Sequence, residues 1–104
     1  MNHSQIFRFS DSIDYSTGGI VSKQVMKNEK GNVTLFAFGK GEGLSEHTAP
    51  FDALIQVIEG EARIIIGGTP YDLKNGESII MPAGIPHAVK ATSDFKMVLT
   101  MIRA

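Results

Sequence analysis

Three histidines carry most of the chemistry available to this 104-residue chain, which contains no cysteine. The lack of cysteine excludes disulfide bonds, thiolate nucleophiles and cysteine-ligated metal sites. His47 and His87 lie beside apolar, strand-like stretches, whereas His3 lies near the first residue, where chains are often mobile. Imidazole can hydrogen-bond, transfer a proton or bind a metal ion, so His47 and His87 are the candidate functional residues. The alternative is that both are ordinary interior histidines, hydrogen-bonded to backbone or water.

The charge and the motifs of the sequence limit the classes of partner that the chain is expected to bind. Ten Lys and Arg residues against eleven Asp and Glu give a net charge of −1, with no block of like charge, which argues against nucleic acid and anionic membranes as partners. No apolar run approaches the about 20 residues that span a bilayer, and the stretch 1–14 is interrupted by charges. The chain has no P-loop, nucleophile elbow or zinc-protease motif. We therefore expect a cytoplasmic protein that binds neither nucleic acid nor membranes.

The elements that must position the histidines are strands. Short apolar and β-branched runs alternate with Gly, Pro, Asn and Asp punctuation, and no segment has the 3.6-residue period of an amphipathic helix. About eight to ten short antiparallel strands in one small domain predict an all-β sandwich or barrel, of which the jelly roll is one solution. The turn after the first strand is expected at residues 28–32. The expected strands are 19–27, 33–38, 44–48, 53–58, 62–66, a short one near residue 71, 78–81, 87–91 and 95–102.

Two segments share the spacing of a known pair of signatures. The segment 41–60 has the spacing G-x5-H-x-H-x3-E-x6-G, with His47 at its first histidine position, and the segment 76–91 has the spacing G-x5-P-x-G-x2-H-x3-N, with His87 at its histidine position. The glycines and Pro82 also stand in register. Only fifteen residues separate the segments, which resembles the minimal single-domain bacterial members of the cupin family. The resemblance implies one cupin domain over residues 1–104, folded as a double-stranded β-helix, or jelly-roll, barrel.

The same resemblance implies a metal site that is incomplete. In metal-binding cupins, two histidines and a glutamate of the first motif and the histidine of the second converge on a divalent ion. His47 and His87 are kept here, but Ala49 stands in place of the second histidine and Ala53 in place of the glutamate. Two imidazoles form a much weaker site than the three or four protein ligands usual for transition metals. We expect no required cofactor, with a weakly bound divalent transition metal at His47 and His87 as the alternative.

Strand alternation argues against replacement of the lost ligands by neighbours. If His47 points into the barrel, Glu46 points out, and if Ala53 points in, Asp52 and Gln56 point out. Asp52 is the least implausible replacement, because a bulge beside the nearby proline could reset the alternation.

The emptied ligand positions favour an organic ligand. Alanine in place of His and Glu enlarges a cavity and makes it less polar, which suits a small organic molecule better than an ion. We expect such a molecule to bind between two polar anchors, His47 and His87, with Ala49, Ala53, Phe51 and Met81 as further ligand-binding residues. Two alternatives remain open. One is a metal-dependent oxygenase or isomerase that uses both histidines, and the other is a metal-free enzyme in which one histidine acts as base and the other as acid.

Several strands are apolar on both faces, which bears on the oligomeric state. Ala53, Ile55 and Val57 lie on one side of their strand, and Leu54 and Ile58 lie on the other. The second face needs a cover, because a large exposed apolar patch conflicts with solubility. We expect a homodimer in which a partner subunit supplies that cover.

Overall fold

The computed structural model describes residues 1–103, which form strands and turns with no helix in that range. The predicted all-β architecture of eight to ten antiparallel strands is confirmed, and each expected strand is present. It follows that residues 1–103 also contain no helix of the length and apolarity needed to cross a membrane. The nine strands are β1 (Ile20–Asn28), β2 (Gly31–Phe38), β3 (Gly43–His47), β4 (Phe51–Glu59), β5 (Glu61–Ile66), β6 (Thr69–Lys74), β7 (Ser78–Met81), β8 (His87–Ala91) and β9 (Phe95–Arg103).

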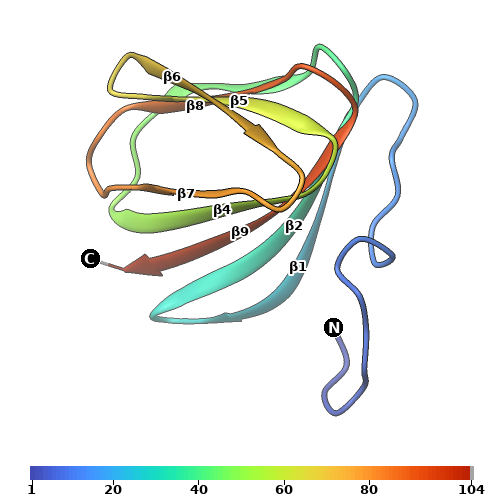
Figure 1. Cartoon of the computed structure of the whole chain (residues 1–104). Helices are drawn as coiled ribbons and strands as arrows, with labels where there is room; N and C mark the ends of the chain where they lie inside the picture. Colours follow the sequence, from blue (N-terminus) through green and yellow to red (C-terminus); the bar gives the residue numbers. More distant parts are fainter. Residues whose placement is uncertain (104) are drawn as a thin grey trace.

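The strands form two antiparallel sheets that face each other (Figure 1). Sheet A has the order β1-β2-β9-β4-β7, and sheet B has the order β3-β8-β5-β6. The two candidate histidines therefore belong to neighbouring strands of sheet B, because β3 pairs with β8. This arrangement is the jelly-roll, or double-stranded β-helix, barrel that the sequence predicted.

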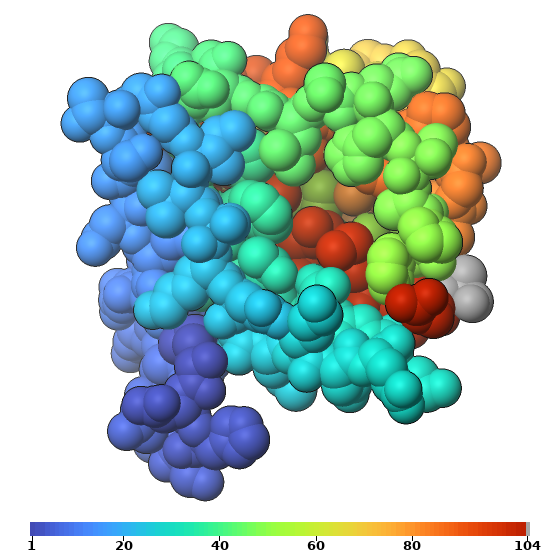
Figure 2. Space-filling view, turned by 180° about the vertical axis from the view of Figure 1, so that it is seen from behind, coloured from blue at the N-terminus to red at the C-terminus, as the bar shows by residue number. Residues whose placement is uncertain are grey.

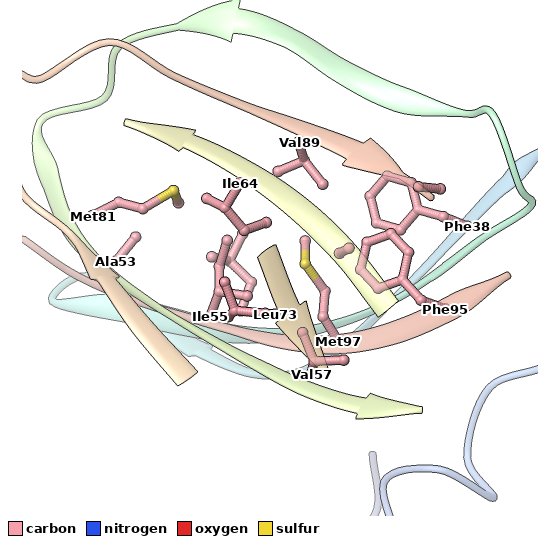
Figure 3. Close-up of a cluster of buried hydrophobic side chains, with 13 residues drawn as sticks. Phe38, Ala53, Ile55, Val57, Ile64, Leu73, Met81, Val89, Phe95 and Met97 are labelled. Atoms are coloured by element: carbon pink, nitrogen blue, oxygen red, sulfur yellow. The ribbon is translucent and has the colours of Figure 1, made fainter. Parts of the chain in front are cut away.

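The core fills the space between the sheets (Figure 3). The rings of Phe38 and Phe95 stack with centroids 4.6 Å apart and planes 5° from parallel, which closes one end of the barrel with large apolar surface. Ile55, Ile64 and Met97 are completely buried beside them. Burial of each such side chain contributes about 1.5–3 kcal/mol, so this cluster is the main source of stability for the sheets.

The first hairpin is tighter than the predicted turn at 28–32. Asn28 pairs with Gly31, so the connection between the strands has only two residues. The Asn28 side-chain oxygen accepts a hydrogen bond of 2.8 Å from the Lys30 backbone N–H, which stabilises the short turn. Gly31 consequently belongs to β2, where any side chain would overlap the Met101 carbonyl oxygen.

The N-terminal arm, residues 1–19, covers part of the outer face of sheet A. Ile13 is buried there against Leu35, Ala37 and Val98, which form a second apolar cluster outside the barrel. Part of the second apolar face is thus covered by the chain itself, which the sequence analysis did not foresee. The sequence feature that indicates this contact is the pair Ile13 and Tyr15, two large side chains on either side of Asp14 in a segment with no strand pattern.

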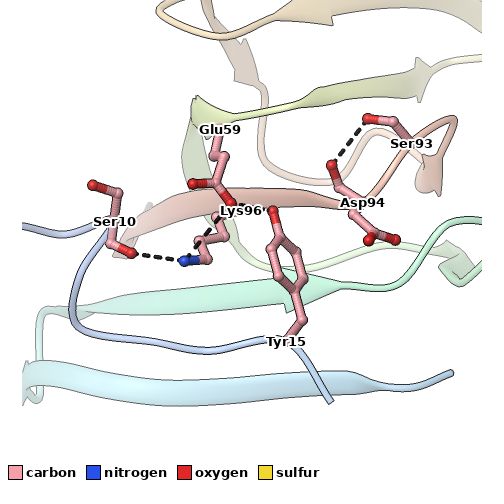
Figure 4. Close-up of polar contacts among 6 residues, drawn as sticks. All are labelled: Ser10, Tyr15, Glu59, Ser93, Asp94 and Lys96. Atoms are coloured by element: carbon pink, nitrogen blue, oxygen red, sulfur yellow. Dashed lines mark hydrogen bonds and ion pairs between the residues drawn. The ribbon is translucent and has the colours of Figure 1, made fainter. Parts of the chain in front are cut away.

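A buried lysine ties the arm to the sheet (Figure 4). The Lys96 ammonium donates a 2.7 Å hydrogen bond to the Ser10 carbonyl, lies 3.7 Å from the Glu59 carboxylate and sits 5.1 Å from the centroid of the Tyr15 ring. The Tyr15 hydroxyl donates a hydrogen bond to the same carboxylate. Burial, together with this bond and the negative charge of Glu59, raises the pKa of Tyr15 well above its usual value.

This shift predicts a loss of stability in alkali that depends on Tyr15. The pKa of Tyr15 in the folded chain lies above the ordinary value of 10.0. The contribution of Tyr15 to the free energy of unfolding is therefore complete below pH 10.0. It declines as the pH rises beyond that value, because Tyr15 ionises first in the unfolded chain. Urea unfolding between about pH 8 and pH 11 measures the effect. The free energy of unfolding should fall more steeply above about pH 10 in the wild type than in Tyr15→Phe, with the exposed Tyr71→Phe as control. Equal slopes in the wild type and Tyr15→Phe would contradict the prediction.

The β4–β5 turn depends on Gly60. Its φ is +75°, and a side chain there would overlap the Asp94 carbonyl oxygen, whereas Gly76 has a φ of +91° with open space around it. Gly76→Ala should therefore cost about 1 kcal/mol from backbone strain alone, and Gly60→Ala about 3 kcal/mol or more. The difference between the two losses, measured by urea unfolding, is the cost of the steric overlap at Gly60. Similar losses would show that backbone strain accounts for both.

Candidate functional site

A β-bulge in β3 brings His47 into the barrel. Leu44 pairs with Val89, but the next paired residue of β3 is His47, opposite His87, so β3 carries one residue more than β8 between these pairs. Leu44 and His47 are three positions apart and nevertheless line the same cavity, which strict alternation would forbid. Glu46 is exposed, as the alternation argument expected once His47 points inward.

The two histidines meet through their Nε2 atoms, which lie 3.1 Å apart. The Nδ1 atom of His47 lies 2.7 Å from the Ser45 carbonyl oxygen, and that of His87 lies 3.1 Å from the Ile85 carbonyl oxygen. Because a carbonyl oxygen only accepts hydrogen bonds, each Nδ1 carries the hydrogen, and in a neutral ring Nε2 then presents a lone pair. The site therefore offers two convergent acceptors.

The histidines occupy different depths. His87 is 6% exposed, whereas His47 is exposed at the rim. Their rings meet edge to face, with centroids 4.4 Å apart. Figure 2 shows the surface hollowed where β2, β9 and the β3–β4 segment meet. The hollow gives solvent and small molecules a route to the pair.

The cavity behind the pair has a volume of about 220 Å³ and apolar walls. Among the lining side chains within residues 1–103, only those of the two histidines are polar. The strands of sheet A form the wall opposite β3 and β8. The lining residues are Phe36, Leu44, His47, Ala49, Ala53, Ile55, Met81, His87, Val89, Met97, Leu99 and Met101.

Most of the residues singled out from the sequence meet in this cavity, and one does not. Ala49, Ala53 and Met81 line it together with both histidines. Phe51 does not line it, although Phe51 and Ala53 share a face of β4, because Phe51 begins the strand at the barrel end. There its ring lies 5.3 Å from the Arg103 guanidinium carbon, outside the set of lining residues, and its role in ligand binding stays a prediction.

The remaining wall residues could have been found by following strand pairing. Ala53 pairs with Met101, and Ile55 pairs with Leu99, so side chains of β9 alternate into the cavity beside those of β4. The pairing register, which the sequence does not reveal, decides which side chains of β9 reach the cavity.

Asp52 and Gln56, the residues considered as replacements for the lost ligands, do not point into the cavity. Asp52 is exposed, and its carboxylate accepts a 2.9 Å hydrogen bond from the Ala83 N–H, which fixes the bend before β8. Gly84 in the same bend donates a 2.9 Å hydrogen bond to the Ala49 carbonyl. Gln56 is exposed as well. The bend and β4 therefore hold each other in place without placing a carboxylate in the cavity.

The donor set does not fit a transition-metal ion held by the protein alone. The backbone carbonyls that orient the two imidazoles are typical supports for metal-binding histidines. However, residues 1–103 contain no group of three His, Cys, Asp or Glu side chains placed to share an ion. Alanine side chains stand where the other ligands belong, so the metal motif is incomplete in three dimensions as well as in sequence.

A closed pair of antiparallel sheets, with histidines from β3 and β8 meeting inside, places the protein among the double-stranded β-helix barrels. The chain belongs to the cupin family, because the profile of the Cupin domain family matches residues 34–103, which is 70 of the 104 residues. A search of the curated proteins finds no match.

Solved structures with the same fold are numerous. A conserved protein of unknown function from Streptococcus pyogenes is 28% identical with a TM-score of 0.94, and the match covers 100% of this chain and 91% of that one. A Cupin 2 conserved barrel domain protein from Leptotrichia buccalis is 41% identical with a TM-score of 0.90, and the match covers 93% of this chain but 47% of that one. KdgF from Halomonas sp. is 20% identical over 88% of this chain and 87% of that one, with a TM-score of 0.73, and shows the fold alone.

The two-ligand site predicts weak metal binding. Protein purified without a metal-affinity tag should contain well under one transition-metal ion per chain, because three or four protein ligands are usual for such ions. Titration with Fe(II), Mn(II), Ni(II), Zn(II) and Cu(II), followed by elemental analysis after dialysis, measures it. The His47→Ala/His87→Ala double variant is the control for binding elsewhere. A stoichiometric ion that the double variant loses would refute this prediction and support a metal-dependent activity.

Proposed function

We propose that the barrel cavity binds a small, mostly apolar organic molecule whose polar end donates a hydrogen bond to the histidine pair. The observation that carries this proposal is the combination of an apolar cavity with a single polar feature, the two Nε2 atoms 3.1 Å apart. Ligand sites are commonly apolar with a few well-placed polar groups that fix orientation. We also propose a cytoplasmic location, on the charge pattern and cysteine-free composition of the sequence.

The size of the cavity limits the ligand. An apolar cavity of about 150 Å³ is large enough for benzene, whereas sites for drug-sized molecules measure about 300–1,000 Å³. At about 220 Å³, this cavity suits a molecule with one ring or a short branched chain. Ala53 favours such a ligand, because a larger side chain at this buried position would project into the same space.

The chemistry of the pair limits the polar group. Two lone pairs that face each other at 3.1 Å repel, so the pair is satisfied when a hydrogen is donated to it. A hydroxyl, a protonated acid or an amine of the ligand can supply that hydrogen. An ether or ketone cannot, because such groups only accept. The arrangement therefore favours donors over acceptors of otherwise similar shape.

A metal-free acid–base enzyme is the second candidate, and the same contact favours it. Two imidazoles whose Nε2 atoms adjoin can hold one proton between them, with one ring acting as base and the other as acid. His47 at the rim can exchange its proton with solvent, while the buried His87 faces the ligand. Turnover of a bound molecule that is lost in both single alanine variants supports this candidate, and binding without turnover supports the first.

Phenol and anisole form a matched pair of probes for the binding proposal. They share a ring, but only phenol donates a hydrogen bond, so phenol should bind more tightly. Because one neutral hydrogen bond contributes about 1 kcal/mol, the phenol-to-anisole affinity ratio should fall about fivefold in His47→Ala. Titration calorimetry or ligand-observed NMR measures both affinities, and Ala53→Leu should abolish both by filling the cavity.

The controls separate a lost site from a damaged fold. Gln56→Leu adds a leucine on the opposite, exposed face of the strand that carries Ala53 and should leave both affinities unchanged. A phenol-to-anisole ratio that His47→Ala leaves unchanged would count against the histidine anchor. Binding that survives Ala53→Leu would count against the cavity itself.

A further inference from the structure

The barrel is closed at one end and open at the other. The stacked rings of Phe38 and Phe95 close the end at which β2 finishes and β9 begins. At the opposite end β3 and β9 finish, while β2, β4 and β8 begin, so His47 and His87 share that end with Arg103, the last residue of β9. In Figure 2 the dark red end of β9 lies in and beside the hollow that leads to the histidine pair. The side chains at this end therefore form the mouth of the cavity.

Strand alternation places Arg103 on the cavity side of β9. Met101 lines the cavity, and Arg103 lies two residues further along, with no bulge in the pairing of this stretch with β4. Residues two apart on a strand share a face and lie about 7 Å from each other along it. Phe51, which pairs with Arg103, likewise shares a face of β4 with Ala53. Arg103 thus stands about 7 Å outside the apolar wall of the cavity, on the same side of sheet A.

The contacts of Arg103 orient its side chain without neutralising its charge. Its backbone N–H donates a 2.8 Å hydrogen bond to the Lys30 carbonyl, and its Nε donates one of 3.3 Å to the Glu29 carbonyl. The ring of Phe51 supports the guanidinium, whose carbon lies 5.3 Å from the ring centre. Neither of the ion pairs found among residues 1–103 includes Arg103. The two terminal nitrogens of a guanidinium form the planar pair of donors that a carboxylate accepts from, so Arg103 presents an oriented anion-binding group.

Two further donors lie on the same face of sheet A. Met101 pairs with Asn32, and Asn32 pairs with Lys27, so these three side chains form a row on the cavity side. The Asn32 side-chain oxygen accepts a 3.1 Å hydrogen bond from the Thr34 hydroxyl, which leaves the Asn32 NH2 group as a donor. The carboxylate of Asp52, on β4 at this end, belongs to the opposite face. The mouth is therefore rich in donors and positive charge, whereas the histidine pair inside offers lone pairs.

We propose that the mouth, formed by Asn32, Phe51 and Arg103, binds the carboxylate end of the cavity ligand. This role rests on the binding function proposed above, because it places the second end of the same molecule. Acceptors inside the cavity and donors at its mouth select a ligand that donates a hydrogen bond at its inner end and accepts at its outer end. The ligand is then a small hydroxy acid with an apolar body between its two polar groups. Positive charge at the mouth attracts such an acid and disfavours an amine of similar shape.

Three para-substituted phenols test the proposal on the full chain. The compounds para-hydroxybenzoate, para-hydroxyphenylacetate and para-hydroxyphenylpropionate hold the carboxylate at increasing distances from the hydroxyl, and the methyl ester of each lacks the charge. At about pH 7.5 the carboxyl groups are ionised. At least one acid should bind about tenfold more tightly than its ester, because hydrogen bonds between charged groups are the strong ones. Titration calorimetry measures the acid-to-ester affinity ratio, with phenol as the probe of the cavity alone.

Variants of Arg103 assign the preference to the mouth. Arg103→Gln should abolish the acid-to-ester preference and leave phenol affinity unchanged, whereas Arg103→Lys, which keeps the charge but not the planar pair of donors, should retain part of the preference. Arg103 is exposed, so these changes should have little effect on folding. Lys90→Gln removes the same charge from an exposed position of β8 and is the matched control, with no change in the ratio expected. Added salt should reduce the preference for the acid but not the affinity for phenol.

The results also separate this proposal from the function on which it rests. If phenol binds but no acid binds more tightly than its ester, the carboxylate-binding mouth is overturned while the cavity function stands. An acid preference that survives in Arg103→Gln overturns it as well, because another group then holds the anion. If neither phenol nor any of the acids binds, both proposals fail.

Discussion

Alternation of side chains along each strand is the constraint on which the rest of the structure depends. Both sheets must send every second residue into one shared interior, and any irregularity in a strand moves all later side chains to the other face. β3 contains such an irregularity at the functional end of the barrel. Its extra residue lets Leu44 seal the cavity wall while His47 still reaches His87. Without the bulge, the strand would turn Glu46 inward and His47 outward, and the pair of acceptors would not form.

The cavity itself requires an explanation, because close packing is the rule in protein interiors. Small side chains such as those of Ala49 and Ala53 leave space that larger apolar side chains would fill with stabilising contacts. A barrel selected for stability alone would place larger side chains at positions such as Ala49 and Ala53. Small residues behind an oriented histidine pair are instead typical of a site that a ligand completes.

The sequence predicted the strands and the barrel, because each rests on local patterns: alternation, turn residues and motif spacing. It also predicted that Asp52 and Gln56 face outward, which the structure confirms. What it could not predict depends on contacts between distant segments. The contact of Phe51 with Arg103 joins residues far apart in the chain, and the 3.1 Å contact of the imidazoles depends on a bulge in β3 that the residues of that strand do not indicate. The cover supplied by Ile13 was missed for the same reason, since its partners lie on β2 and β9.

The inner and outer faces of sheet A are apolar for different reasons, although the same strands supply both faces. Ala53 faces the cavity while its neighbour Leu54 lies on the outer face of sheet A, and the same alternation separates Met81 from Ile80 on β7. One face is apolar because the barrel interior must be, and half of the other is apolar because the arm lies on it. Val33 belongs to the arm-covered part of the outer face, because it packs against the cluster around Ile13. A one-residue shift in the register of β2 would turn Val33 and Leu35 inward and Phe36 outward, so one strand register fixes the cavity wall and the arm contact together.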